Sequence, residues 1–148
     1  MLGFGNFNNL YFTTSQVALL HKYIPVEHHQ VEISVTNLTA FENGVLDQCQ
    51  LENIEAQSWS PMGNGLFTEH KEQHTRILAE ATSLSKVYDF SVNQILLAFL
   101  YAHPGQIAPI IGTTKFERIQ EAKKAMEIEL TREDFYKLWT ASTGKEVA

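Results

Sequence analysis

The sequence predicts an α/β fold with about three to four parallel strands and flanking helices. Segments with strand-like patterns alternate with segments of helical periodicity, and no two-residue turn of the Asn-Gly type joins two strands. Parallel strands need helical crossovers between them, so this alternation favours a parallel sheet. The length of 148 residues fits one domain.

The first two predicted elements are a helix and a strand. Residues 13–23 start with Thr13 and Gln16 at the spacing of a capping box, followed by a short apolar face, which predicts a helix. In residues 28–35, HHQVEISV, every second residue from His29 onward can share one face. This alternation predicts a strand with one mainly apolar and one polar face.

The middle of the chain predicts a helix, a strand and a loop. Residues 39–50 have a helical pattern that the pair Asn43-Gly44 interrupts. Residues 54–60, IEAQSWS, predict a second strand. The next five residues, PMGNG at 61–65, hold one proline and two glycines. They predict an irregular loop that a ligand approaches closely.

The rest of the chain predicts four helices and one short strand. Residues 70–86 carry apolar residues along one face. A capping box that starts at Ser91 begins a strongly apolar helix, the best candidate for a buried one. Residues 108–111 predict the short strand, and Thr114 and Thr131 are the expected caps of the last two helices.

The turn between the last predicted strand and its helix offers a site for an anion. A helix N-terminus leaves backbone N–H groups unpaired and carries about half a positive charge. A glycine permits a tight turn, hydroxyls donate hydrogen bonds and two cations add charge, which together suit a phosphate. These residues are Gly112, Thr113, Thr114, Lys115 and Arg118. The alternative is an ordinary N-cap at Thr114, with both cations solvated or paired with Glu121.

Composition and charge argue against nucleic-acid binding, a membrane span and secretion. Its 17 acidic and 11 basic side chains give a net charge of -6 with no basic stripe, so no nucleic acid is expected as a partner. No run of about 18 apolar residues predicts a membrane span. The N-terminus lacks the pattern of a secretory signal, so a cytoplasmic location is expected. The single cysteine, Cys49, is expected to be structural.

Other groupings of side chains give weaker signals. His70 and His74 are four residues apart on a predicted helix, but they lack the glutamate of the metalloprotease motif. A solvated helix face is favoured there, and no metal site is predicted. His28 and His29 are expected to point to opposite faces of their strand. Ser60 lies outside any GxSxG motif, which argues against a hydrolase.

Four segments are informative when they are considered together: LGFGNF at 2–7, HQVEIS at 29–34, SWSPMGNG at 58–65 and IIGTTKFERIQEA at 110–122. In order and approximate separation they resemble the aldo-keto reductase family, and the similarity spans essentially the whole chain. The resemblance implies a (β/α)8 barrel that reduces carbonyls with NADPH. Only the second half of that barrel is matched, as a single partial domain over 1–148, because a full barrel takes about 250 residues or more.

The resemblance implies cofactor-binding roles for residues at matching positions. Asn6 and Gln30 match the residues that hold the nicotinamide carboxamide, and Trp59 stands where the family stacks an aromatic ring on the nicotinamide. The loop that crosses the pyrophosphate corresponds to Ser60, Met62, Gly63 and Asn64. The residues near the adenosine 2′-phosphate and the adenine correspond to Gly112, Thr113, Lys115, Arg118 and Glu121.

Two kinds of departure from the family are visible. Gly5 replaces a serine, Ala122 stands where many members have an adenine-binding asparagine, and Gly112 stands where some have a lysine. These losses imply weaker cofactor binding. The family's catalytic aspartate, tyrosine, lysine and histidine belong to the first half of the barrel, and their motifs do not occur here. No tyrosine has a lysine and a histidine suitably placed to lower its pKa, so no catalytic residue is predicted.

The sequence therefore predicts the NADP(H)-binding half of an oxidoreductase of this family, inactive as an isolated chain. If the chain is active, a separate chain must supply the catalytic tyrosine and lysine. A nonenzymatic half-barrel is the first alternative: it would bind nucleotide, and pair with itself or with a complementary half through exposed strand edges. A truncated or split gene product is the second. The carbonyl substrate is not predicted.

Overall fold

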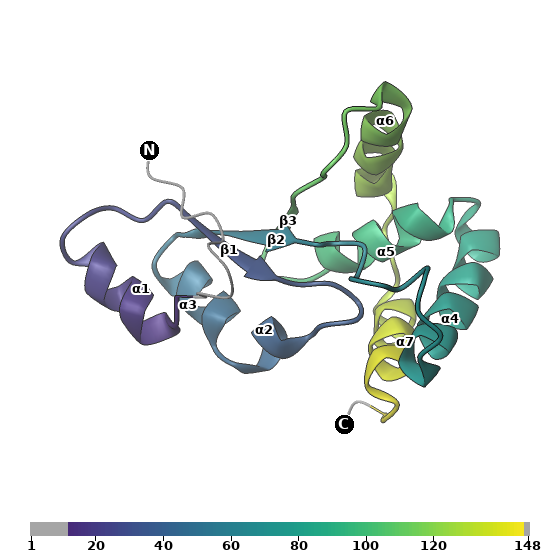
Figure 1. Cartoon of the computed structure of the whole chain (residues 1–148), viewed down its shortest axis with the longest axis horizontal. Helices are drawn as coiled ribbons and strands as arrows, with labels where there is room; N and C mark the ends of the chain where they lie inside the picture. The colour runs from purple at the N-terminus through teal and green to yellow at the C-terminus, as the bar shows by residue number, and fades with distance from the viewer. Residues whose placement is uncertain (1–11, 147–148) are drawn as a thin grey trace.

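The structure is a computed structural model that describes residues 12–146, and a three-stranded parallel sheet forms its centre (Figure 1). The strands are β1 (His28–Glu32), β2 (Glu55–Trp59) and β3 (Ala108–Pro109), and their spatial order is β1-β2-β3. Both pairings are parallel. The predicted α/β class with parallel strands is therefore confirmed, although the last strand is shorter than expected.

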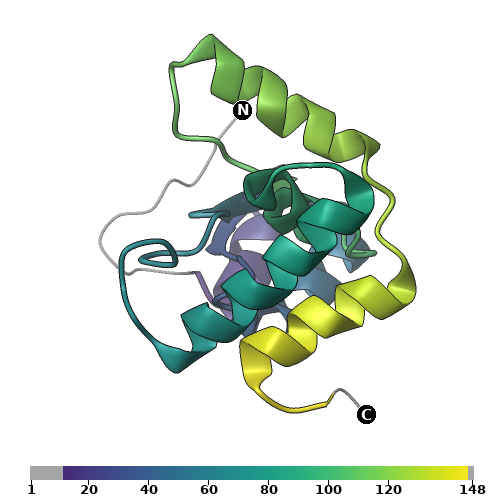
Figure 2. The same cartoon turned by 90° about the vertical axis from the view of Figure 1, so that its right-hand side faces the viewer.

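In the described part of the chain, one helix precedes β1 and helices follow every strand. They are α1 (Thr14–His21), α2 (Thr39–Glu42), α3 (Val45–Leu51), α4 (Glu72–Tyr88), α5 (Val92–Tyr101), α6 (Phe116–Lys124), the short 3-10 helix η1 (Ala125–Glu127) and α7 (Arg132–Thr143). Figure 1 shows α1 to α3 on one side of the molecule and α4, α5 and α7 on the other. In Figure 2, α4 lies alongside both α5 and α7, with which it packs.

Most predicted helix starts are confirmed by their caps. Thr13 and Ser91 form the capping boxes expected for α1 and α5, and the Thr131 hydroxyl accepts a hydrogen bond from the backbone of Asp134. The expected helix over 39–50 divides into α2 and α3 at Gly44, whose φ of 80° belongs to the left-handed region that glycine adopts without a steric penalty.

One predicted cap is wrong. The N-cap of α6 is Lys115 and not Thr114, and no side chain bonds to the first turn of this helix. The Thr113 hydroxyl accepts a hydrogen bond from the Lys115 backbone N–H at 3.2 Å instead. This short-range bond shapes the turn one residue before the helix, so α6 begins later than the local pattern predicts.

The two faces of the sheet have different surroundings. Register places His29 beside Ala56 and Val31 beside Ser58, and these four residues are buried. The opposite face carries half-buried or exposed polar residues, including Gln30 and its neighbours. The predicted division into a core face and a polar face is confirmed within β1, where His28 lies on the opposite face from His29, as expected. The strand ends at Glu32 rather than at residue 35, and Ser34, expected on the polar face, is fully buried.

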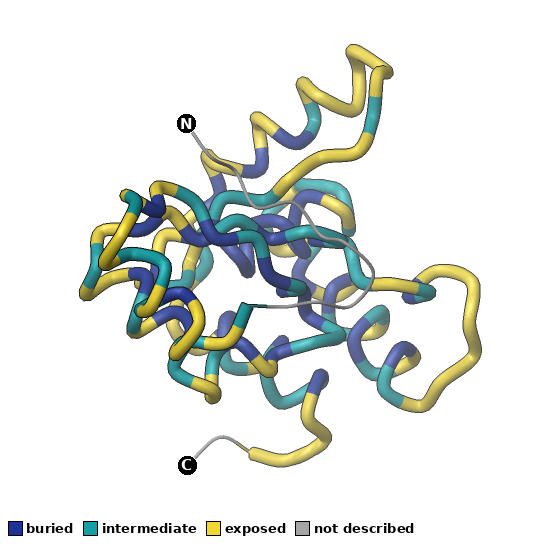
Figure 3. Tube along the Cα trace, turned by 60° about the vertical axis from the view of Figure 1, so that its left-hand side comes forward, coloured by how far each residue is buried: buried dark blue, intermediate teal, exposed yellow. Residues whose placement is uncertain are grey.

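The core is continuous from the sheet into α5. Every residue from Gln94 to Leu100 is buried, which confirms the prediction of a buried helix. Phe99 stacks on Phe135 of α7 with ring centroids 4.7 Å apart. Figure 3 shows this buried region in dark blue, whereas most of α6 is exposed. Within residues 12–146 no helix is long and apolar enough to cross a bilayer.

Candidate functional site: a pocket between two loops

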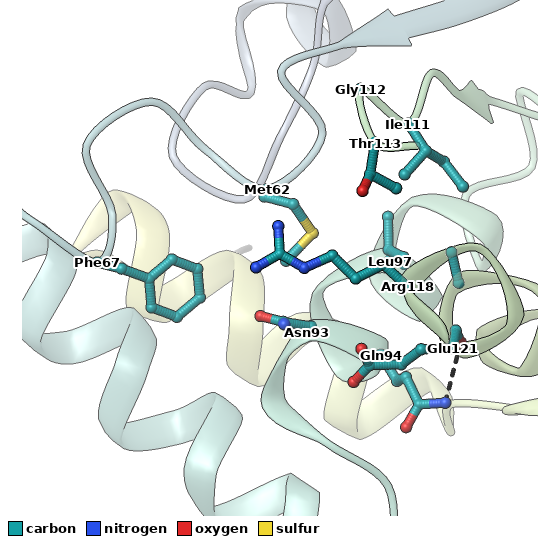
Figure 4. Close-up of a pocket in the computed structure, with 11 residues that line it drawn as sticks. Met62, Phe67, Asn93, Gln94, Leu97, Ile111, Gly112, Thr113, Arg118 and Glu121 are labelled. Carbon is teal, nitrogen blue, oxygen red and sulfur yellow. Dashed lines mark hydrogen bonds between the residues drawn. The ribbon is translucent and has the colours of Figure 1, made fainter. Parts of the chain in front are cut away.

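The loop after β2 and the turn before α6 meet at a pocket of about 540 Å³ (Figure 4). Its volume lies in the range of small-molecule sites. Five of the predicted cofactor residues line it: Met62, Gly112, Thr113, Arg118 and Glu121. Phe67, Asn93, Gln94, Leu97, Ile111 and Ala122 complete the wall. Residues about fifty positions apart in the sequence are thus brought to one cavity, as the prediction of a shared site requires.

Arg118 supplies the positive charge of this pocket. It lies in the first turn of α6, and Figure 4 shows its guanidinium reaching past Met62 into the space that the Phe67 ring also borders. Among the described residues it forms no ion pair with a carboxylate. The alternative in which Arg118 pairs with Glu121 is therefore not what the structure contains, and the guanidinium is available to an anion.

Glu121 has a different role from a charge partner. Its carboxylate accepts a hydrogen bond from the Ser91 hydroxyl, which also caps α5. Its backbone carbonyl accepts from the Gln94 amide at 3.0 Å. These contacts fasten α6 to the start of α5, so they hold one wall of the pocket against the other.

The turn before α6 divides the predicted phosphate residues. Gly112 and Thr113 line the pocket, whereas Lys115 is exposed and does not. A Cβ atom at Gly112 would meet no atom within 4 Å, so the cavity is open at this point. Lys115 can add long-range attraction for an anion, but the wall itself is built without it.

The loop after β2 has an unusual backbone. Ser60 has a φ of 50°, which is uncommon for a residue with a side chain, and Gly63 has a φ of 78°. A hydrogen bond from the Gly63 N–H to the Ser60 carbonyl closes a turn between them. Met62 enters the pocket from this turn, whereas Asn64 is exposed and lies outside the wall.

The residues expected at the nicotinamide lie elsewhere. Gln30 and Trp59 share the polar face of the sheet, because Gln30 is in register with Gln57, two residues before Trp59. The Gln30 amide donates to the Gln57 carbonyl oxygen at 3.1 Å. Neither Gln30 nor Trp59 lines the pocket, and Asn6 lies outside the described residues.

Several other side chains that could react are instead hydrogen-bonded or buried within the fold. The Tyr88 hydroxyl is engaged by Asp134 and by the backbone of Thr131, and burial raises the pKa of Tyr101. Burial also raises the pKa of the Cys49 thiol to about 11, which fits the predicted structural role. In residues 12–146 no three His, Cys, Asp or Glu side chains lie close enough to hold a metal ion.

The predicted histidine pair is separated by the start of α4. His70 precedes this helix and is exposed, whereas His74 lies within it and is buried. The His74 Nδ1 atom is 3.1 Å from the Glu69 carbonyl oxygen, within hydrogen-bond distance. The two imidazoles therefore do not share a solvated helix face, and the expectation for that face is corrected.

Sequence reasoning did not assign five residues to the pocket wall, whereas Ala122 had been noted as a departure at an adenine-binding position. The apolar ones, Phe67 and Leu97, look like ordinary core residues in a sequence. Asn93 carried one usable signal, because it follows the Ser91 cap and the first turn of a helix is a common place for ligand contacts. Only the packing of α5 beside α6 shows that these residues face the same cavity.

This arrangement can hold an anionic ligand with a flat ring. Arg118 offers charge and a planar surface, and Phe67 offers an aromatic ring on the other side of the cavity (Figure 4). The apolar side chains of Leu97 and Ile111 can cover a base, while the phosphate remains near solvent. A nucleotide, with its planar base and anionic phosphate, has this combination of properties.

The sequence is similar to those of several oxidoreductases and reductases. The chain is 31% identical over 140 residues to the uncharacterized oxidoreductase YcsN of Bacillus subtilis, covering 92% of this chain and 47% of the relative. It is 32% identical over 143 residues to the oxidoreductase YdhF of Escherichia coli, with 92% and 46% covered. A 6-dehydroglucose reductase of Agrobacterium fabrum is 29% identical over 147 residues, with 99% and 48% covered. The chain thus spans about half the length of these relatives.

Solved structures show the same fold. A thermostable aldo-keto reductase in complex with the inhibitor epalrestat superposes with a TM-score of 0.75 at 23% identity, covering 88% of this chain and 46% of that one. An aldo/keto reductase from Klebsiella pneumoniae, in complex with NADP and acetate, gives a TM-score of 0.61 at 21% identity, with 76% and 38% covered. The model of the Aldo/keto reductase family matches residues 2–142. The chain belongs to the aldo/keto reductase family.

Proposed function

We propose that this chain is the NADP(H)-binding part of an aldo-keto reductase and that its pocket takes the adenosine 2′-phosphate end of the cofactor. The observation that carries the proposal is the meeting of Arg118, from the first turn of α6, with Met62, from the loop after β2, at one cavity. The sequence suggested cofactor contact for both segments. The unpaired guanidinium supplies the charge that a 2′-phosphate needs.

The remainder of the cofactor would extend from this pocket toward the polar face of the sheet. Ser60, Gly63 and Asn64 belong to the loop that directly follows Trp59 and brings Met62 into the pocket, and they would pass the pyrophosphate. Gln30 and Trp59 would meet the nicotinamide. The Gln30 amide nitrogen already bonds to Gln57, so its carbonyl oxygen is the group left to accept from a carboxamide.

Titration calorimetry with NADPH and NADH tests the proposal. Replacing Arg118 with alanine should weaken NADPH binding by about tenfold or more and leave NADH less affected, because a charge-assisted hydrogen bond to the 2′-phosphate is lost. Lys123→Ala is the matched control, since Lys123 is an exposed cation at the other end of α6. Equal losses for both cofactors, or no binding of NADPH to the unaltered chain, would contradict the proposal.

We further propose that carbonyl reduction requires a complementary half-barrel. Within the described residues, β1 and β3 are the edges of a parallel sheet, and edges of this kind pair readily with other strands. The limited coverage of the relatives supports the same view. With a carbonyl substrate, the isolated chain should not oxidise NADPH, so its absorbance should stay constant. The absorbance should decrease once the complementary half is added. Turnover by the isolated chain would refute the requirement.

A further inference from the structure

Like the Arg118 guanidinium, the Asn93 side chain of the pocket has no hydrogen-bond partner among the described residues. Asn93 lies in the first turn of α5 and is exposed, and among residues 12–146 its carboxamide forms no hydrogen bond. The neighbouring amide of Gln94 is already engaged through both groups, because its oxygen accepts from the Ser91 N–H at 2.9 Å and its nitrogen donates to the Glu121 carbonyl at 3.0 Å. Asn93 is therefore the carboxamide that a ligand in this cavity can use.

The surroundings of Asn93 favour a flat heterocycle. In Figure 4 its side chain lies below the Arg118 guanidinium and faces the space bordered by the Phe67 ring. Both neighbours are planar groups on which a base can stack. The hydroxyl of Thr113, another polar group of the wall, already accepts from the backbone of Lys115. An edge of a base that enters here would thus meet the Asn93 amide.

We infer that Asn93 determines specificity for adenine by pairing with its N6/N7 edge, an inference that rests on the proposed nucleotide function. An asparagine amide accepts from the 6-amino group through its oxygen and donates to N7 through its nitrogen. Hypoxanthine has an acceptor at both positions, so the same amide can make only one of the two bonds. Ala122, on the α6 wall, has no polar side chain to share this task.

The test compares NADPH with its hypoxanthine analogue by titration calorimetry. The unaltered chain should bind NADPH roughly tenfold more tightly, as expected for one bidentate amide–adenine pair. In Asn93→Leu and Asn93→Ala this preference should disappear, chiefly through weaker binding of NADPH. Because Asn93 is exposed, both variants should remain folded, which circular dichroism checks. Gln120→Leu, which removes an exposed amide of α6 outside the pocket wall, should retain the preference.

The possible results separate this inference from the function on which it rests. If the unaltered chain binds both dinucleotides equally, or if both Asn93 variants retain the preference for adenine, the role of Asn93 is refuted while the nucleotide site stands. If the unaltered chain binds neither dinucleotide, both proposals are refuted. The inference is supported if both Asn93 variants lose the preference for NADPH over its hypoxanthine analogue. Arg118→Ala should weaken the binding of both dinucleotides and retain that preference.

Discussion

The Gln94 side chain of α5 donates a hydrogen bond to the Glu121 carbonyl of α6 at 3.0 Å. Its oxygen simultaneously accepts from the backbone of Ser91, so one amide joins the start of one helix to the middle of the next. Attachment of α6 depends on few such contacts, because Ala122 is its single buried residue among those described. Gln94 therefore helps to fix the position of Arg118, on α6, relative to the pocket residues of α5.

Replacing Gln94 with methionine should lower the free energy of unfolding by about 1 to 3 kcal/mol. Methionine has a similar shape but neither pairs with the Ser91 N–H nor donates to Glu121, so two hydrogen bonds are lost in a largely buried place. Urea denaturation measures the change. Gln120→Met, on the exposed side of α6, should change stability by less than about 0.5 kcal/mol. If the two substitutions lowered the free energy of unfolding equally, the hydrogen bonds of Gln94 would make no specific contribution to stability.

Alanine at Gly63 should destabilise the protein, because the loop after β2 has no room for a side chain there. The added Cβ would lie 2.8 Å from Cγ2 and Oγ1 of Thr36, and the φ of 78° disfavours any residue with a Cβ. We expect a loss of about 1 to 3 kcal/mol in urea denaturation, from the strain and from displacement of Thr36.

Gly112→Ala is the matched control for that substitution. Its Cβ would meet nothing within 4 Å, and its φ is not in the left-handed region, so the free energy of unfolding in urea should be nearly unchanged or slightly increased. A loss at Gly112 as large as the loss at Gly63 would contradict the view that close contact with Thr36 is the cause.

Local sequence patterns predicted the elements of this fold better than the walls of its pocket. Thr13 and Ser91 were identifiable because a capping box is encoded within four residues. The same rule failed at Thr114, since the adjacent Thr113 also has a hydroxyl and bonds to the Lys115 backbone. Choosing between two neighbouring threonines requires the conformation of the turn, which a spacing rule does not contain.

The candidate site was predicted in part for a related reason. Arg118 and Met62 were recognised through a family resemblance, because their segments have distinctive sequences. Asn93 and Phe67 face the same cavity only because α5 packs beside α6 and the loop after β2 approaches both (Figure 4). Such a meeting of distant segments depends on tertiary packing and leaves no local pattern.

Stability should fall as the pH drops below about 6.5, and His103 should account for part of the loss. Desolvation lowers the pKa of His103, an effect that Asp47 partly offsets, and its Nδ1 atom accepts from the Gly105 N–H at 3.0 Å. The unfolded chain binds a proton more readily than the folded one, so stability is complete above the unfolded pKa and declines as pH falls toward the folded pKa. The slope from this residue is at most about 1.4 kcal/mol per pH unit.

His103→Asn isolates this contribution, because asparagine offers an acceptor to Gly105 and does not ionise. The difference in unfolding free energy between pH values of about 7.5 and 5.5 should be smaller in the variant than in the unaltered chain. His29 has a pKa that burial also lowers, and its contribution is common to both proteins. His70→Asn, at an exposed position, is the control. If His103→Asn and the unaltered chain have identical pH dependence, His103 is not the source.

Removal of the Tyr88 hydroxyl should loosen the contact between α4 and α7. This hydroxyl donates to Asp134 Oδ2 at 2.7 Å and accepts from the Thr131 N–H at 3.0 Å, so it joins the end of α4 to the cap of α7. Tyr88→Phe keeps the ring and should lower the free energy of unfolding by about 1 to 3 kcal/mol, since one of the two bonds is to a carboxylate. Urea denaturation of Tyr23→Phe gives the baseline, because Tyr23 is a residue that is 80% exposed. Lys137 would still bond to Asp134, so the effect should remain local. Native-state hydrogen exchange should then show faster exchange in the first turn of α7 without unfolding of the sheet. Uniformly faster exchange across the chain would argue against a local role.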